Sequence, residues 1–172
     1  MAVDLDSPKA GDQESVETLT PLERIGVVAT WPASDKSALV SAIVLVLVLW
    51  SLLLMAAARS NLERFPFIDP EILDLQIEMS FLILGLWVAL GATSFLLRRK
   101  YPQSRFFTVA PVQLYAISNS IIAYFFGYFT EPYGFMTLVG GMMVALPIFG
   151  RDATRLGLMS WLLVFGVLTT LE

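Results

Sequence analysis

Residues 98–105 read Arg-Arg-Lys-Tyr-Pro-Gln-Ser-Arg, with four basic side chains and no acid, and they separate two long apolar stretches. Loops rich in Lys and Arg that lie close to the ends of transmembrane helices stay on the cytoplasmic side, because moving those charges across an energised bilayer is costly. We therefore place residues 98–105 on the inner side of a membrane and orient the other segments from this loop.

The composition is typical of a polytopic helical membrane protein. The 172 residues are 56% hydrophobic and only 15% charged, and the mean hydropathy is +0.71. The apolar residues form continuous runs long enough to span a bilayer, whereas a transmembrane barrel would show short segments of alternating polarity. The predicted fold class is all-α, a transmembrane helical bundle of about five spans with a disordered acidic N-terminal tail.

The N-terminal region divides into two parts. Residues 1–19 are polar and acidic without periodicity, which predicts a disordered cytoplasmic tail. Thr20-Pro21-Leu22-Glu23 forms a capping box and predicts an interfacial amphipathic helix over 20–32, which either couples to a partner or anchors the chain at the membrane surface. The distribution of basic residues gives no support for nucleic-acid binding.

The transmembrane bundle is expected over 37–172. Its predicted spans are 37–58, 70–97, 106–130, 133–149 and 153–171. Asp69 is a good N-cap with Pro70 at the first helical position. The helix that follows is roughly 45 Å long at 1.5 Å per residue, which exceeds a hydrocarbon core of ~30 Å. We therefore expect its first two turns to stand outside the bilayer.

Charge sets the expected location of each turn. The loop at 59–71 has a net negative charge and is placed outside, whereas the turn with Arg151 and Arg155 is placed inside. The predicted location is the bacterial inner (cytoplasmic) membrane, multi-pass, with a cytoplasmic N-terminus. Because the last span ends next to Glu172, we expect that the bundle is incomplete at the C-terminus and that the chain is a fragment of a longer protein.

Glu71, Asp74 and Glu78 recur on one face at the start of the second span. Three carboxylates on one stripe are weak candidates for binding Mg²⁺ or Ca²⁺ if a second acidic element lies near. The alternative is a solvated face, since acids near a helix N-terminus complement the helix dipole. We favour the solvated face and predict no metal site.

The third predicted span, 106–130, is the most polar of the five. Its polar residues occupy about half of the helix circumference, which cannot face lipid cheaply. Such side chains commonly join helices to one another by hydrogen bonds. The sharper alternative is a ligand pocket between the third and fourth spans toward the outer leaflet, and its candidate residues are Gln113, Tyr115, Asn119 and Tyr124.

The chain contains no cysteine and no histidine. That excludes thiolate catalysis, disulfides, and zinc or haem sites that depend on histidine. No nucleophile and base can be paired without these residues or intramembrane carboxylates. We therefore predict no catalytic residues and no cofactor.

Residues 127–152 read GYFTEPYGFMTLVGGMMVALPIFGRD, an aromatic and glycine-containing outer turn, a Gly-Gly span and a short basic inner turn. In this pattern the chain resembles the membrane-associated sensor domains that precede diguanylate and adenylate cyclases in bacteria. The resemblance implies about six helices and a linker into a cytosolic catalytic domain, so any cyclase activity would lie in a C-terminal domain that is missing here.

Three functions from different classes follow. The first is a sensory or anchoring module that relays a signal to a cytosolic output domain such as a nucleotide cyclase. The second is a small accessory or structural subunit of a membrane complex. A transporter ranks last, because transporters place ionisable groups or broken helices near the bilayer midplane. The expected partners are the lipid bilayer, a cytosolic output domain or partner protein and, in a homodimer, a second copy of the chain.

Overall fold

The computed structural model describes residues 26–65, 68–126 and 133–170, and every regular element in these ranges is helical. The helices are α2 (Ala33–Ser60), the short 3-10 helix η1 (Leu62–Arg64), α3 (Pro70–Leu97), α4 (Arg105–Phe126), α5 (Tyr133–Phe149) and α6 (Arg151–Thr170). The all-α fold class is thereby confirmed. The predicted tail at 1–19 lies outside the described residues. Of the predicted interfacial helix over 20–32, residues 26–32 are described: 26–29 are helical, whereas 30–32 form a turn before α2.

Local sequence signals fix several helix ends. Asp69 caps α3, because its Oδ1 accepts a hydrogen bond of 2.9 Å from the backbone N–H of Glu71, and Pro70 follows at the first helical position. Gly150 ends α5 with a φ of 87°, a left-handed conformation that glycine adopts without a steric penalty. The bounds predicted for α3 and α5 are confirmed. In contrast, α2 begins at Ala33, four residues before the expected start.

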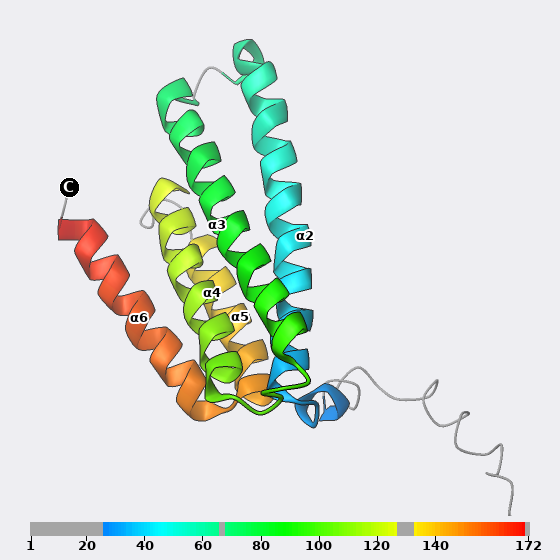
Figure 1. Ribbon diagram of the computed structural model, residues 1–172. Coiled ribbons are helices and arrows are strands. Elements are labelled where there is room, and N and C mark those ends of the chain that lie inside the picture. Colours follow the sequence, from blue (N-terminus) through cyan, green and yellow to red (C-terminus); the bar gives the residue numbers. More distant parts are fainter. Residues whose placement is uncertain (1–25, 66–67, 127–132, 171–172) are drawn as a thin grey trace, which may run out of the picture.

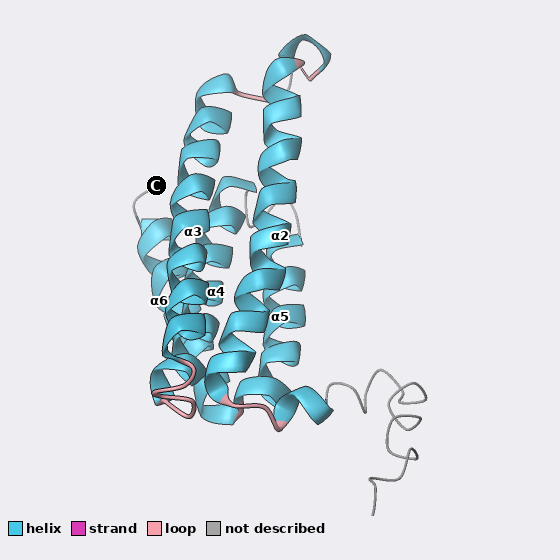
Figure 2. Cartoon of the chain, turned by 45° about the vertical axis from the view of Figure 1, so that its right-hand side comes forward, coloured by secondary structure: helices cyan, strands magenta, loops and turns pink. Residues whose placement is uncertain are grey.

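The helices form two groups that lie side by side (Figures 1 and 2). We call α2 and α3 the hairpin group, since these two antiparallel helices of 28 residues each pack along each other. We call α4, α5 and α6 the C-terminal group. The hairpin group extends beyond the C-terminal group at the end opposite to the loop at 98–104 (Figure 1).

Small residues bring α2 and α3 together near the end that carries this loop. Ser37 and Ser94 are fully buried, and their Oγ atoms are 2.8 Å apart. The Ser94 hydroxyl donates to the carbonyl oxygen of Leu90, so Ser37 donates to Ser94. One turn further on, a Cβ built on Gly91 would lie 3.2 Å from the Cβ of Ser41. Small residues at such positions let helix backbones approach closely, as they do in membrane helices.

Each group has its own apolar core. In the hairpin group, the core contains Val48, Leu52, Met55, Leu73, Ile83, Trp87 and Leu90. In the C-terminal group, it contains Val112, Ala116, Leu138, Met142, Ala145, Ala153 and Trp161. Tyr115 of α4 packs against both cores. The boundary between the two groups is therefore a separate packing surface within the bundle.

Among the described residues, three helices are long and apolar enough to cross a membrane, namely α2, α3 and α4 as far as Phe125. Residues 136–149 of α5 form a shorter apolar helix. On the outer faces of α2 and α3, large apolar side chains are exposed, among them Val46, Leu53 and Leu96 at 66%, 65% and 75%. A continuous surface of this kind is typical of contact with lipid rather than water. The structure therefore supports a membrane protein.

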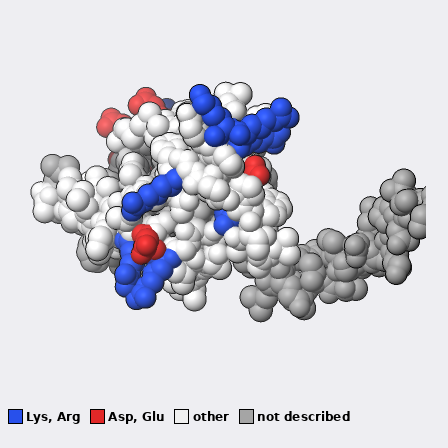
Figure 3. Space-filling model, turned by 60° about the horizontal axis from the view of Figure 1, so that its bottom comes forward, with Lys and Arg blue, Asp and Glu red and all other residues white. Residues whose placement is uncertain are grey.

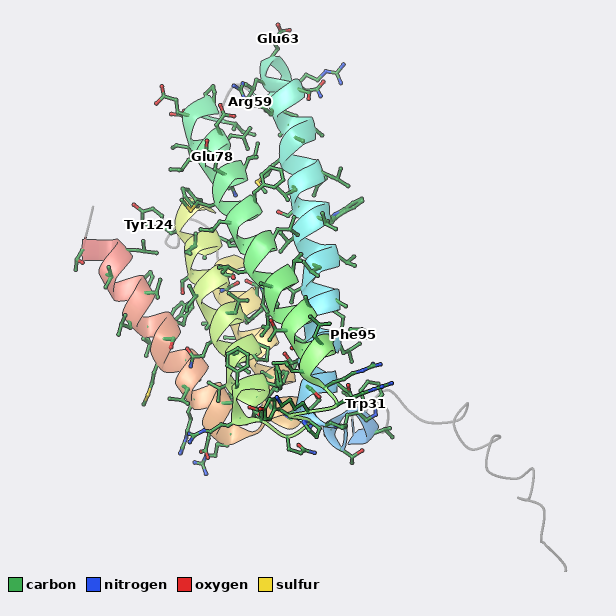
Figure 4. All side chains as sticks on the ribbon, in the orientation of Figure 1. Trp31, Arg59, Glu63, Glu78, Phe95 and Tyr124 are labelled. Atoms are coloured by element: carbon green, nitrogen blue, oxygen red, sulfur yellow. The ribbon has the colours of Figure 1, made fainter. Side chains whose placement is uncertain are left out.

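Charged residues gather at the two ends of the bundle. The α3–α4 loop and the α5–α6 turn, which carry six basic residues between them, share one end. Viewed toward this end, Lys and Arg side chains are more prominent than acids (Figure 3). At the opposite end lie Arg59, Glu63 and Glu78, far from Trp31 (Figure 4). The basic loop and the basic turn, which the sequence analysis places on the same side of the membrane, thus lie at the same end of the bundle.

One ion pair joins α2 to α3 at the protruding end of the hairpin group. The Arg59 guanidinium donates two hydrogen bonds to the carboxylate of Asp74, at 2.6 and 2.9 Å. Asp74 is the middle residue of the predicted carboxylate stripe, so its charge is balanced by Arg59. Within the described ranges, no three acidic side chains come together as a metal-ion site. Glu71 and Glu78 are exposed, which fits the solvated-face interpretation.

We expect this ion pair to be weak. Both side chains are nearly half exposed, at 45% and 49%, and exposed pairs contribute about 0.2–1 kcal/mol. A double-mutant cycle with Arg59→Gln and Asp74→Asn should therefore give a coupling free energy in this range that falls as salt is added. Thermal unfolding in detergent measures it. A coupling above about 2 kcal/mol would instead indicate a desolvated pair.

Candidate functional site: a cavity between the two helix groups

The polar helix α4 is at the centre of the bundle. It contacts α2, α3, α5 and α6, and Ser118, Asn119 and Ser120 on it are buried. This arrangement follows from its sequence, because polar side chains in a span must find partners inside the protein. The prediction that its polar face points into the bundle is confirmed for these residues.

Two of the four candidate ligand residues take part in a hydrogen-bond network between α4 and α5. The Tyr115 hydroxyl donates to the backbone carbonyl of Thr137 at 2.5 Å. In turn, the Thr137 hydroxyl donates to the side-chain oxygen of Asn119 at 2.8 Å. Tyr115 and Asn119 are one helical turn apart and share a face. The network thereby fixes the register between α4 and α5 at this depth.

The same network explains a glycine on α5. A Cβ on Gly141 would overlap the ring of Tyr115, whereas a Cβ on the adjacent Gly140 would meet nothing within 4 Å. Thr137 and Gly141 are four residues apart, so the tyrosine ring lies across one turn of α5. Of the two glycines, the close approach of α4 therefore requires Gly141 and not Gly140.

The other two candidates lie elsewhere. Gln113 accepts a hydrogen bond from the hydroxyl of Ser160, which joins α4 to α6. Tyr124 lies near the end of α4 that faces away from the basic loop (Figure 4), and its ring packs edge-on against Phe125 with centroids 5.8 Å apart. Neither residue lines the cavity described next, so the four candidates do not form one site.

A cavity of about 570 Å³ lies between the hairpin group and the C-terminal group. This volume is within the range of small-molecule sites in proteins. The lining residues come from four helices and are Val44, Leu47, Val48, Trp50, Ser51 and Leu54 of α2, Ser80, Ile83 and Trp87 of α3, Tyr115, Ser118, Asn119, Ile122 and Ala123 of α4, and Thr137 of α5. None of them carries a formal charge.

The cavity lies in the half of the bilayer away from the basic loop. Along α3, Trp87 and Ser80 are roughly 15 and 25 Å from the end of the helix at Leu97, at 1.5 Å per residue. Along α4, Tyr115 and Ala123 are about 15 and 27 Å from Arg105 by the same measure. In a hydrocarbon core of ~30 Å, both helices place the cavity in the half that is farther from the basic loop.

Two polar atoms at this cavity make no hydrogen bond in the described part of the chain. They are the indole Nε1 of Trp87, a completely buried residue, and the Oγ of Ser118, a residue of which 6% of the surface is exposed. A buried indole N–H usually has a partner. Sequence reasoning missed Trp87, although a tryptophan in the middle of a span instead of at the interfacial belt is a signal of a special environment.

Comparison with models of protein families, with curated proteins and with solved structures gave no match for any of the three. The resemblance to cyclase-associated sensor domains therefore stays a prediction. Its outer turn, at 127–132, also lies outside the described residues.

The contrast between the two adjacent glycines gives a test of the α4–α5 contact. Gly141→Ala should lower the free energy of unfolding by about 1–3 kcal/mol, the usual effect of overpacking, because the Tyr115 ring has to move. Gly140→Ala is the matched control and should be neutral or stabilising by up to about 1 kcal/mol, since alanine favours helix. Thermal unfolding in detergent compares them. Equal melting temperatures for the two variants would contradict this packing.

Proposed function

We propose that this chain is a membrane-embedded sensory or anchoring module that relays a signal to a cytosolic output domain. The observation that carries the proposal is the position of the cavity. It lies at the boundary between two separately packed helix groups and is lined by residues of both. A molecule bound there contacts both groups, so its binding free energy depends on how they are placed relative to each other.

The chemistry of the cavity supports binding rather than catalysis. Its polar groups are hydroxyl, amide and indole groups, with no carboxylate, amine or guanidinium among the lining residues. Such groups recognise a ligand by hydrogen bonds and shape. General acid–base catalysis near neutral pH commonly uses histidine, carboxylate or lysine side chains. An output activity such as nucleotide cyclisation therefore belongs, in this proposal, to a cytosolic domain.

The proposal includes a five-span topology with a cytoplasmic N-terminus. In it, α5 and α6 cross the membrane together with the three longer helices, and both basic turns face the cytoplasm. Support comes from their shared end of the bundle (Figure 1). An interfacial role for residues 20–32 agrees with the position of Trp31, which is 40% exposed at that same end (Figure 4).

Reporter fusions in a bacterial inner membrane test this topology. Alkaline phosphatase is active only outside the cytoplasm, so a fusion after Ser60 should be active and a fusion after Arg105 should be inactive. The basic residues of the α3–α4 loop provide the physical reason. The reverse pattern of activity would refute the topology.

Spin-label distances test the sensory role against that of a structural subunit. The chain has no cysteine, so pairs can be introduced at lipid-facing positions without background. The pair Leu53→Cys and Met143→Cys measures the distance between the two helix groups. The pair Leu53→Cys and Leu82→Cys is a control within the hairpin group. Leu53, Met143 and Leu82 are 65%, 72% and 58% exposed.

A sensory module needs two arrangements of its helix groups. In lipid nanodiscs we expect two distances for the pair between groups, differing by about 2 Å or more, as in helix shifts of known switches. The control pair should show one distance. A single narrow distance for both pairs would favour the accessory or structural subunit.

A further inference from the structure

We propose that the cavity between the helix groups binds an uncharged, lipid-soluble carbonyl compound that enters from the bilayer. The inference rests on the proposed sensory role and deepens it by naming the class of ligand. Three observations carry it: the absence of charge among the lining residues, the mouth of the cavity on the outer face of α2, and an unpaired donor beside it.

The lining selects a neutral and mainly apolar molecule. Of the fifteen lining residues, the polar ones are Trp50, Ser51, Ser80, Trp87, Tyr115, Ser118, Asn119 and Thr137, and the others are aliphatic. No lining residue offers an opposite charge, so an ionised ligand would be buried at mid-bilayer depth without compensation, at a high cost in free energy. Amino acids, which carry two charges at neutral pH, are disfavoured for the same reason.

The mouth of the cavity opens toward lipid. Leu47, Trp50 and Leu54 of α2 line the cavity, and yet 60%, 62% and 55% of their surface is exposed. These residues lie on a helix whose outer face is apolar and long enough to span the bilayer. A ligand that reaches the cavity by this route has first dissolved in the bilayer, so it is lipid-soluble.

The indole of Trp87 requires an acceptor. Its N–H group donates and cannot accept, so a partner has to supply an oxygen lone pair. The Ser118 hydroxyl, also without a partner and also at the cavity, both donates and accepts. A carbonyl oxygen has two lone pairs and accepts from both groups. It adds no charge and brings no donor of its own.

Thermal unfolding of the purified chain in dodecyl maltoside, a detergent without a carbonyl group, tests the proposal. The probe is 2-dodecanone, and n-dodecane is the matched compound without an oxygen. Because a ligand that binds only the folded state raises the melting temperature, 2-dodecanone should raise it in a saturable manner and n-dodecane should raise it less. An equal effect of the two compounds would overturn the proposal.

Two matched pairs of variants locate the effect. Trp87→Phe removes the N–H group and keeps an aromatic ring, and it should weaken 2-dodecanone binding by up to about tenfold, the usual value of one hydrogen bond. Trp161→Phe makes the same change in the core of the C-terminal group, outside the cavity, and should bind as the unmodified chain does. Unchanged affinity in Trp87→Phe would overturn the assignment of the donor.

A second pair of variants, at two serines of α4, tests the same proposal if Trp87→Phe does not fold. Ser118→Ala removes the second unpaired polar group of the cavity. Ser120→Ala is its control, since the buried Ser120 hydroxyl already donates to the carbonyl of Ala116 and does not line the cavity. We expect weaker 2-dodecanone binding, by a few-fold, in Ser118→Ala alone. Equal affinities in the two variants would contradict the proposal.

The carbonyl group can come from a free compound or from the ester of a bilayer lipid. Nanodiscs of diester and of diether phospholipid, which differ only in this carbonyl, distinguish the two sources. A higher melting temperature in diester lipid, lost in Trp87→Phe, identifies the lipid ester; equal values with retained binding of 2-dodecanone identify a free compound. Binding without a change in the distance between helix groups would support the site and reject the sensory role.

Discussion

The structure depends on one constraint, that a polar side chain within the hydrocarbon layer has no water to bind and must find its partners in the protein. The constraint explains why α4, the least hydrophobic of the three long spans, is central and is also the most buried of them. Its amide and hydroxyl groups form hydrogen bonds with neighbouring helices, Gln113 with α6 and Tyr115 with α5. An apolar helix such as α2 has no such requirement and lies at the edge.

Close packing between the helices relies on small residues, because lipid is as apolar as the side chains it replaces and burial alone drives little association. Ser37 and Ser94 join α2 to α3, and Gly141 receives the ring of Tyr115 at the α4–α5 contact. Gly157 of α6 does the same for Val112, whose Cγ1 would lie 2.7 Å from an added Cβ. Each group is thus held internally by steric fit, and the space that remains lies between the groups.

The sequence predicts the helices well and the site only in part, and the reason is physical. Helix ends follow from local chemistry, so Asp69 with Pro70 and the glycine at 150 give the bounds of α3 and α5 directly. The inward face of α4 follows from its polarity. Which neighbour each polar residue meets depends on tertiary packing, and for that reason Gln113 and Asn119, both correctly placed inside, bind to different helices. Trp87 could not be assigned a face, because the part of α3 around it is apolar on all sides and the carboxylates of α3 are confined to its first turns.

The unequal lengths of the two groups have a mechanical consequence. The helices of the hairpin group have 28 residues, against 22 in α4, so the hairpin continues for roughly 9 Å past the end of α4 at 1.5 Å per residue. At its tip, η1 follows α2, and the exposed contact between Arg59 and Asp74 links α2 to α3. If such a hairpin tilts about its end near the basic loop, its whole length acts as a lever arm. A tilt of about 5° over its ~42 Å length displaces the tip by about 4 Å, so a slight change deep in the bilayer becomes a large displacement in the aqueous phase.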